Sequence, residues 1–351
     1  MVLPLTLKVP LIPVTVSDRF EPIEACELFP RLNAHRQAWV EALGRGLLHR
    51  TFVLEHRNAS GEVDGLLPLA LVQSLLFGRF LVSLPYVNTG GVWAGNEDVA
   101  RELIDEACDL ADQHNVKYLE LRHERPVEHP RLNFSRTDKK HMRLALPESA
   151  EELDRSFKSK LRSQVKKSNE YGSSLQVGGA ELLPSFYEIF AINMRDLGTP
   201  VFSQNLFLNI LNSFAGDAEI CLVRQKGRAV AAGLLVHAGG VTEVPSASSL
   251  REYNRTNANM WMYRNMLARA IERGSHTFDF GRSSEGAGTY KFKAQWGAKP
   301  EPAHWQYYVR KGSPEDMRPD SDGKQRLVQI WQKLPVWLTR LVGPSIVRGI
   351  P

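Results

Sequence analysis

The chain contains 351 residues, a length that predicts two domains or one large one. Hydrophobic residues make up 43% of the chain and charged residues 24%, which excludes disordered and collagen-like proteins. The 44 Lys and Arg against 39 Asp and Glu give a formal charge of +5, which is compatible with anionic partners. Three cysteines (Cys26, Cys108 and Cys221) are widely spaced, which excludes a disulfide scaffold and a thiolate zinc site and indicates a reducing compartment.

The N-terminal segment is apolar but does not read as a leader. Pro4, Pro10 and Pro13 interrupt it, so residues 1–16 predict an extended strand rather than a signal peptide. No stretch of the sequence reaches the roughly 20 apolar residues of a membrane span. We therefore expect a cytoplasmic protein.

Hydrophobic period and turn residues predict two series of elements in the same order. The first series consists of strands at 51–56, 63–72 and 80–84, a helix at 97–114 and a strand at 116–122. The second consists of strands at 219–224, 228–237 and 241–246, a helix at 256–273 and a strand at 276–280. The displacement stays near about 160 residues throughout, so we favour an internal duplication of a hairpin–strand–helix–strand unit. Chance matches between uncertain boundaries are the alternative.

The junction between the two series is expected near Pro147. Ser149 and Glu152 form an S-x-x-E capping box, which predicts the start of a helix. We expect this helix to continue to about Tyr171 and to end at Gly172.

Two stripes at i, i+4 spacing run along this expected helix. The apolar stripe consists of Leu153, Phe157, Leu161 and Val165. The cationic stripe consists of Lys158, Arg162 and Lys166, with Lys160 and Lys167 beside it. Two interpretations stay open: a clamp for the phosphates of a nucleotide, a sugar carrier or RNA, and an ordinary solvated helix face.

The stretch 281–293, GRSSEGAGTYKFK, follows an expected strand and permits a tight loop through its glycines. It matches neither G-x-x-x-x-G-K-[ST] nor G-x-G-x-x-G. Aromatic residues then alternate with lysines, so we expect a two-faced strand with Tyr290 and Phe292 on one side and Lys291 and Lys293 on the other.

Acid–base candidates are few. Glu243 lies on an expected central strand, where a buried carboxylate has a raised pKa and can accept a proton from an amine. A hydrogen-bonded structural residue is the alternative. The sequence has no H-E-x-x-H and no G-x-S-x-G, so we expect neither a metal ion nor a serine nucleophile.

The C-terminal stretch 324–348 has a helical period on both sides of Pro335. It combines an apolar face and tryptophans with basic residues. Such a helix either lies at a membrane surface or packs across the two halves as a structural tail. Both interpretations stay open.

Several of these stretches resemble the FemAB/FemX family of tandem GNAT-like aminoacyltransferases, and most of all the FemAB-related proteins of exosortase and exopolysaccharide loci. The resemblance covers roughly residues 80–351. The stretches that carry it are LPYVNTGGVW at 84–93, KSKLRSQVKKSNEYG at 158–172, NMRDLGTPVFS at 193–203, FDFGRSSEGAGTYKFKAQWGAKP at 278–300 and the tail at 331–351.

The resemblance implies an α+β fold of two tandem GNAT-like units with mixed sheets flanked by helices. We expect a structural unit at 1–147, a catalytic unit at 148–311 and a helical tail at 324–351. Phe292–Lys293 matches a Phe–Lys pair tied to catalysis in the family, so Lys293 is expected to stabilise negative charge on the acyl transition state. The expected substrate contacts are Lys158, Lys160, Arg162, Lys166, Arg195, Arg282 and Tyr290, with Glu243 as the candidate base.

Characterised relatives transfer an amino acid from aminoacyl-tRNA to the amine of a peptidoglycan precursor. The segment 248–259, SSLREYNRTNAN, has no glycine where GNAT enzymes hold the coenzyme A pyrophosphate, and the sequence has no coiled-coil arm. The donor therefore stays open between aminoacyl-tRNA, acyl-coenzyme A and an acyl carrier, each as a co-substrate, with no resident cofactor.

We expect an acyl- or aminoacyltransferase acting on an amine or hydroxyl of a cell-envelope or exopolysaccharide precursor. A phosphorylated glycan or a lipid-carrier precursor is the expected partner, with peripheral contact to the inner face of the membrane through the tail. The alternatives are an acetyl-coenzyme A-dependent N-acetyltransferase and a non-catalytic protein that binds a glycan carrier.

Overall fold

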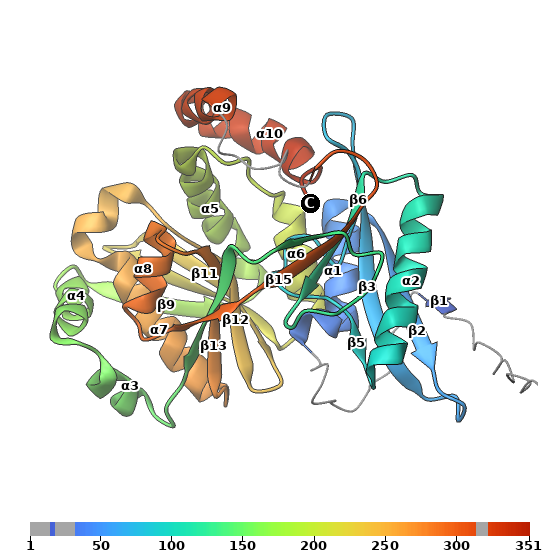
Figure 1. The fold of residues 1–351 in the computed structure, drawn as a ribbon. Helices are drawn as coiled ribbons and strands as arrows, with labels where there is room; N and C mark the ends of the chain where they lie inside the picture. The colour runs from blue at the N-terminus through green and yellow to red at the C-terminus, as the bar shows by residue number, and fades with distance from the viewer. Residues whose placement is uncertain (1–14, 18–31, 314–321) are drawn as a thin grey trace, which may run out of the picture.

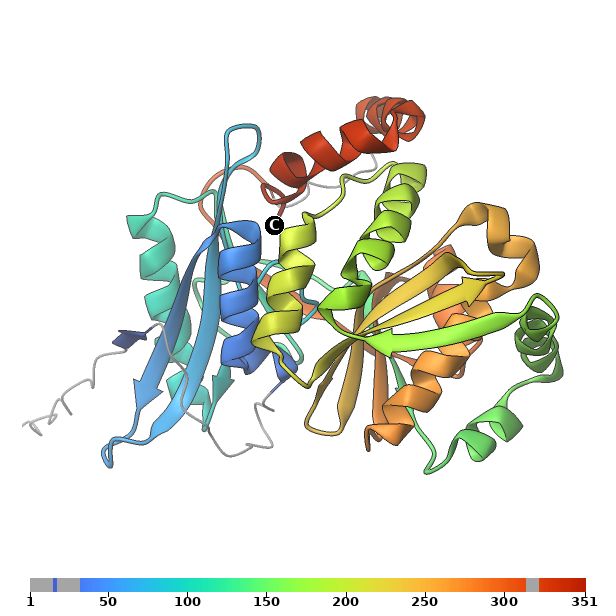
Figure 2. The same ribbon diagram turned by 180° about the vertical axis from the view of Figure 1, so that it is seen from behind.

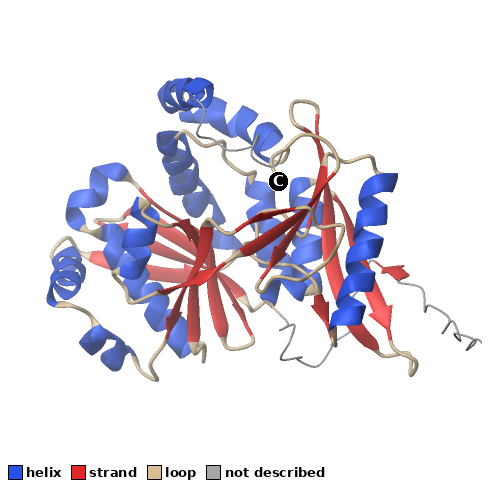
Figure 3. Cartoon of the chain, in the orientation of Figure 1, coloured by secondary structure: helices blue, strands red, loops and turns tan. Residues whose placement is uncertain are grey.

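The computed structural model describes residues 15–17, 32–313 and 322–351. Two mixed β-sheets lie side by side, and helices cover both faces of each (Figures 1 and 3). Of the strand expected at residues 1–16, positions 1–14 lie outside the described residues; the described part belongs to β1 (Thr15–Ser17), which pairs with β2.

The first sheet has eight strands in the order β1-β2-β3-β4-β6-β15-β7, with β5 paired to β3. Helix α2 (Glu97–Gln113) covers one face and α1 (Gln37–Leu47) the other (Figures 1 and 2). Asn96 begins α2 by accepting hydrogen bonds from two backbone N–H groups. The strands are β2 (Arg50–Arg57), β3 (Val63–Ser74), β4 (Gly78–Val82), β5 (Trp93–Ala94), β6 (Tyr118–His123), β7 (Phe134–Arg136) and β15 (His304–Val309).

The second sheet has seven strands in the order β14-β8-β13-β12-β11-β10-β9. Its strands are β8 (Lys139–Ala145), β9 (Ser173–Gly178), β10 (Ala218–Gln225), β11 (Arg228–Ala238), β12 (Val241–Ser249), β13 (Thr277–Ser284) and β14 (Lys299–Pro302). One face carries α3 (Ala150–Ser156), α4 (Ser159–Asn169), α7 (Ala258–Glu272) and α8 (Gly288–Ala294). The other face carries α5 (Leu183–Leu197) and α6 (Gln204–Ser213).

The expected duplication is confirmed by the pairing of the strands. In each sheet three antiparallel strands are followed by a helix and a fourth strand parallel to the third: β2-β3-β4-α2-β6 and β10-β11-β12-α7-β13. Two parallel strands need a long crossover connection, which is usually a helix, and α2 and α7 supply it in the two sheets.

The single helix expected at 149–171 is wrong, because Phe157 and Lys158 are extended and divide it into α3 and α4. The expected start of the helix is confirmed: Ser149 is its N-cap and accepts a hydrogen bond from the Glu152 N–H. The break lets Phe157 pack edge-on against Trp296. Arg162 donates to the Phe157 carbonyl at 2.6 Å, which satisfies a group that a continuous helix would have bonded.

The two halves share strands and a hydrophobic core. Strand β8 lies in the second sheet although it precedes Pro147, and β15 lies in the first sheet although it follows β13 and β14. The boundaries expected at 147 and 311 stay predictions. Helices α1 and α6 pack so closely that a Cβ on Gly46 would lie 2.7 Å from the Leu206 Cα. The largest core cluster therefore runs without interruption from one half into the other.

The tail consists of α9 (Asp322–Lys333) and α10 (Val336–Val347), which pack over α5 (Figure 1). It also reaches the first half, where Gly349 lies against Ser74. The tail thus packs across the two halves as a structural element, which is one of the two interpretations that the sequence left open. Within the described ranges, no helix has the length and apolar character needed to cross a membrane.

Candidate functional site

Strands β12 and β13 part in the middle of the second sheet. They pair from Val241–Thr277 to Glu243–Asp279 and then diverge. An extra residue in β12 produces a bulge at 244–245, opposite the step from Leu234 to Val236 in β11. The hydrogen bonds between β12 and β13 stop at this point, so the two strands leave an opening between them.

A loop of the first half, residues 84–91, lies across this opening. Two of its residues, Leu84 and Tyr86, have positive φ angles of 61° and 73°, which non-glycine residues rarely adopt. The Tyr86 hydroxyl is 2.8 Å from the Ser246 hydroxyl on β12. Asn88 lies so close to Gly281 of β13 that a Cβ there would be 2.9 Å from the Asn88 Nδ2. The loop therefore contacts both of the parted strands.

A cavity of about 440 Å³ lies between the halves on one side of this loop, and we call it the inter-half cavity. Its polar lining includes His49, Tyr86, Asn88, Arg122, Asn193, Ser246, Ser248, Arg282 and Arg348. The remaining lining residues come mainly from α5, β12 and the end of the tail.

Two arginines meet in this cavity at one indole ring. The guanidinium carbons of Arg122 and Arg282 lie 4.4 and 4.5 Å from the Trp305 ring centre. Arg122 is fully buried and paired with Glu120 at 2.7 Å. The Arg282 Nη1 is buried too, but it makes no hydrogen bond to any residue in the described part of the chain.

A positive charge on Arg282 is therefore costly in this cavity. Burial, and after it the charge of Arg122, lowers the pKa of Arg282 to about 9. A buried guanidinium with unmade hydrogen bonds favours binding of a planar or tetrahedral anion. The substrate contact expected at Arg282 stays a prediction.

The strand expected around Tyr290 and Phe292 is wrong: these residues form the short helix α8. In this helix, Tyr290 and Phe292 both pack against the core of the second half. Phe292 packs on Tyr263 with ring centres 4.9 Å apart, and Tyr290 packs against the same core. Packing of these aromatic side chains against α7 thus favours a helix, although the alternating sequence pattern predicts a strand.

The Lys293 side chain extends from α8 to the backbone of β13. Its Nζ donates to the carbonyls of Gly281 and Arg282 at 3.1 and 2.9 Å. Burial lowers the pKa of Lys293 to about 8, while the nearby carboxylate of Asp279 raises it. Lys293 is not among the described residues that line the inter-half cavity, but it binds the backbone of Arg282, which does.

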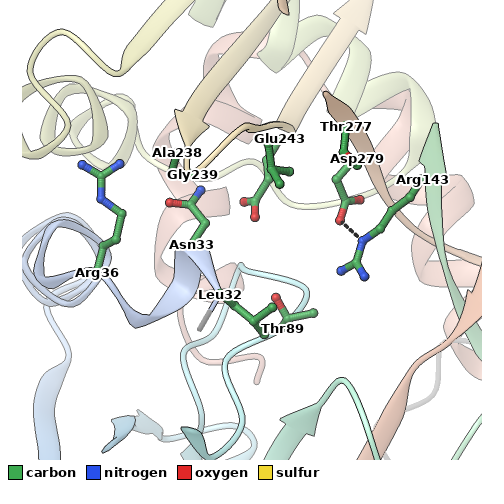
Figure 4. A pocket seen from close by; sticks show the side chains of 11 residues that line it. Leu32, Asn33, Arg36, Thr89, Arg143, Ala238, Gly239, Glu243, Thr277 and Asp279 are labelled. Carbon is green, nitrogen blue, oxygen red and sulfur yellow. Dashed lines mark hydrogen bonds and ion pairs between the residues drawn. The ribbon is translucent and has the colours of Figure 1, made fainter. Parts of the chain in front are cut away.

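Glu243 lines a second cavity, of about 420 Å³, on the other side of the loop (Figure 4). Figure 4 shows the Glu243 carboxylate and the Asn33 amide facing each other across it. Arg143 holds Asp279 at 2.9 Å and also pairs with Glu124 and Glu301. Burial, and then the charge of Asp279, raises the pKa of Glu243 to about 8. A carboxyl group with this pKa exchanges protons near neutral pH.

Replacing Glu243 by glutamine should therefore change how stability depends on pH. Between about pH 4.5 and about pH 8 the folded protein keeps a proton that the unfolded chain releases, so wild-type stability falls as pH rises. We expect the Glu243→Gln variant to gain stability over wild type by about 1.4 kcal/mol per pH unit through this range, measured by urea unfolding at both ends. The exposed Glu285→Gln variant serves as the matched control. If the free energy of unfolding depended on pH in the same way in wild type and Glu243→Gln, this would contradict the raised pKa of Glu243.

The cationic stripe lies elsewhere. Arg162 and Lys166 line a groove of about 450 Å³ between α4 and α7, together with Trp261 and Arg264. Lys158 and Lys160 are exposed at the start of α4. Lys158 and Lys160 do not line this groove, and none of the four cations lines the inter-half cavity.

Arg195 contacts the tail: its Nη1 donates to the Leu334 carbonyl at 3.2 Å and its Nε pairs with Asp196. Sequence reasoning missed Arg122, Tyr86 and Asn88. A signal for Arg122 was present, because Glu120 and Arg122 share one face of an otherwise apolar strand, which is the spacing of a buried ion pair.

Residues 155–294 match the family model described as an acetyltransferase (GNAT) domain. The solved structure of FemX is similar with a TM-score of 0.60 and 17% identity, covering 84% of this chain and 93% of FemX. The C-terminal domain of a putative lysylphosphatidylglycerol synthetase from Agrobacterium fabrum gives 0.52 and 11%, covering 78% and 88%. A conserved protein of unknown function from Bacteroides thetaiotaomicron gives 0.52 and 12%, covering 78% and 90%.

No curated protein sequence matches the chain. At these identities the solved structures establish the fold, and the expected architecture of two GNAT-like units is confirmed. The parting of β12 and β13 lies inside the segment that matches the family model. Residues 155–294 thus form a domain of the GNAT acyltransferase type, set in a two-sheet fold similar to that of FemX.

Proposed function

We propose that this protein transfers an acyl or aminoacyl group to an amine or hydroxyl of a cell-envelope or exopolysaccharide precursor. The observation that carries the proposal is the inter-half cavity at the parting of β12 and β13, where the Arg282 Nη1 makes no hydrogen bond to a described residue. The similarity to FemX supports the class of reaction. The sequence resemblance to FemAB-related proteins of exosortase and exopolysaccharide loci supports the class of acceptor.

In the proposed reaction the acceptor attacks the donor carbonyl directly, and no covalent enzyme intermediate forms. The carbonyl oxygen becomes an oxyanion, which collapses as the donor's leaving group departs; the acceptor loses one proton and the leaving group gains one. The cavity positions the two reactants, and Lys293, which binds the Arg282 carbonyl at the wall of the cavity, supplies positive charge that stabilises the forming oxyanion. Arg282 binds an anionic group of the substrate.

The proposed partners are a phosphorylated glycan or lipid-carrier precursor and an activated acyl donor, which is a co-substrate rather than a resident cofactor. Aminoacyl-tRNA is the donor favoured by the resemblance. The groove that contains Arg162 and Lys166 supplies a second cationic surface for its phosphates. We place the reaction in the cytoplasm, at the inner face of the membrane.

The alternative of an acetyl-coenzyme A-dependent enzyme is favoured by the match to the acetyltransferase domain. Against it, residues 251–256 form a 3₁₀-helix (η3, Arg251–Thr256) without glycine before α7. Side chains on this segment hinder the close backbone approach that a pyrophosphate requires.

Mass spectrometry of precursor glycans tests the function. We expect cells that lack the gene to lose one acyl or aminoacyl mass from these glycans, and the wild-type gene to restore it. Identical glycan masses in both strains would contradict the proposal. Calorimetric titration of the purified protein with coenzyme A separates the alternative: we expect no saturable heat, and tight binding would favour the acetyltransferase.

A further inference from the structure

Large apolar side chains remain exposed along the tail and at the tip of the β3–β4 hairpin. Trp337 and Leu341 on α10 are 67% and 70% exposed, and Leu76 in the hairpin is 75% exposed. Leu75, Leu327 and Ile330 are exposed to a similar or greater degree. A monomer that leaves so many large side chains in water on neighbouring elements has an interaction surface there.

The hairpin and the end of the tail lie side by side. Gly349, at the end of the tail, approaches the hairpin so closely that a Cβ there would be 2.6 Å from the Ser74 Oγ. Figures 1 and 2 show the hairpin tip beside the end of α10 at the same edge of the molecule. We call Leu75, Leu76, Leu327, Ile330, Trp337 and Leu341 the tail–hairpin surface.

The tail already uses its inner face. Val328 lies against Gly198 at the end of α5, and Thr339 is fully buried. The exposed apolar side chains therefore lie on the opposite face, which no described residue covers. A second contact within this chain is not needed to hold the tail in place.

The charge of the tail indicates what covers it. Residues 322–351 contain five lysines and arginines against a single carboxylate, Asp322 at the start of α9. Lys333 and Arg340 are exposed next to the apolar side chains. A cationic helix pair with exposed tryptophan and leucine matches the interface of a bilayer that contains anionic lipids.

We propose that the tail–hairpin surface docks this protein on the surface of a membrane rich in anionic phospholipid. Trp337, Leu341 and the hairpin leucines enter the boundary between headgroups and acyl chains, and the lysine and arginine side chains bind lipid phosphates. Two separate elements anchor the protein, so its orientation on the bilayer is fixed.

The orientation has a consequence for the inter-half cavity. Val347, Arg348 and Ile350, at the end of the tail, line that cavity. Docking through the tail therefore brings the cavity next to the lipid surface, within reach of an acceptor attached to a lipid carrier. This last step rests on the proposed function, whereas membrane docking does not.

Flotation with lipid vesicles tests the docking. We expect the full-length protein to float with vesicles of phosphatidylcholine and phosphatidylglycerol, and the Trp337→Ser/Leu341→Ser variant to lose about tenfold or more in partitioning. Leu75→Ser/Leu76→Ser should weaken partitioning as well, which tests the hairpin. Lys333→Ser should lose about fivefold on these vesicles and nothing on phosphatidylcholine alone.

Val177→Ser, at an exposed apolar position on the edge strand β9, is the matched control and should float like wild type. Unchanged flotation of the Trp337→Ser/Leu341→Ser variant would overturn the proposal. A dimer in analytical ultracentrifugation that dissociates in this variant, without flotation of the wild type, would overturn it too and assign the surface to a second copy. Flotation without any acyl transfer would leave docking supported and reject the proposed function.

Discussion

The Lys293→Met variant is expected to turn over about 10²–10³-fold more slowly than wild type in acyl transfer. Methionine keeps the stem that packs in α8 but removes the ammonium group that the structure holds beside the parted strands. Because burial lowers the pKa of Lys293 to about 8, wild-type turnover should also fall as pH rises through that value and the ammonium loses its proton. The rate of donor consumption, followed by mass spectrometry, measures both effects.

The control for this prediction is Lys291→Met. Lys291 lies on the same helix but is exposed, so its replacement removes an equal charge from the surface and should leave turnover within about twofold of wild type. Wild-type turnover in the Lys293→Met variant would reject the role assigned to the lysine. A loss of the same size in both variants would attribute the effect to general charge.

The second large effect is expected from Arg122→Met. Arg122 pairs with the buried Glu120, donates to the carbonyls of Leu84 and Val87 and stacks on Trp305. Its removal leaves the Glu120 carboxylate without its partner and releases the loop that divides the two cavities. We expect the free energy of unfolding in urea to fall by about 3–5 kcal/mol.

The double variant Glu120→Gln/Arg122→Met separates the stability lost with the ion pair from the stability lost with the packing of Arg122. Without the carboxylate no charge is left uncompensated, so the double variant should recover part of the stability that Arg122→Met loses. Hydrogen exchange of the amides at 84–91 should still be faster than in wild type, because both carbonyl contacts of the guanidinium are missing. Equal stability of the single and double variants would show that the pair contributes nothing beyond packing.

Elements with a strong hydrophobic period could be predicted from the sequence. All ten elements of the two expected series are present, and β3 and α2 begin at the expected residues, Val63 and Glu97. These segments bury a continuous face or stripe, so tertiary packing and local pattern agree. Strands β7 and β14 are short and exposed or half-buried, and nothing in their composition distinguishes them from loops.

Where prediction was wrong, a tertiary contact outweighed the local pattern. The alternation in residues 290–293 favours a strand, yet packing of Phe292 on Tyr263 produces a helix. The break after Ser156 depends on the position of Trp296, which is far away in sequence. The same limit applies to the site: Arg282 was expected to bind substrate, but its neighbours Arg122 and Trp305 come from the other sheet.

The exchange of strands also governs the order in which the molecule can be completed during synthesis. Strand β6 has β4 on one side from the start, but its other edge stays open until residues 304–309 leave the ribosome. An open edge of this kind invites pairing with other chains. Since β15 is made after every strand of the second sheet, the first sheet closes last. A nascent chain interrupted anywhere before β15 is therefore left with an unfinished N-terminal half, whatever the state of its second half.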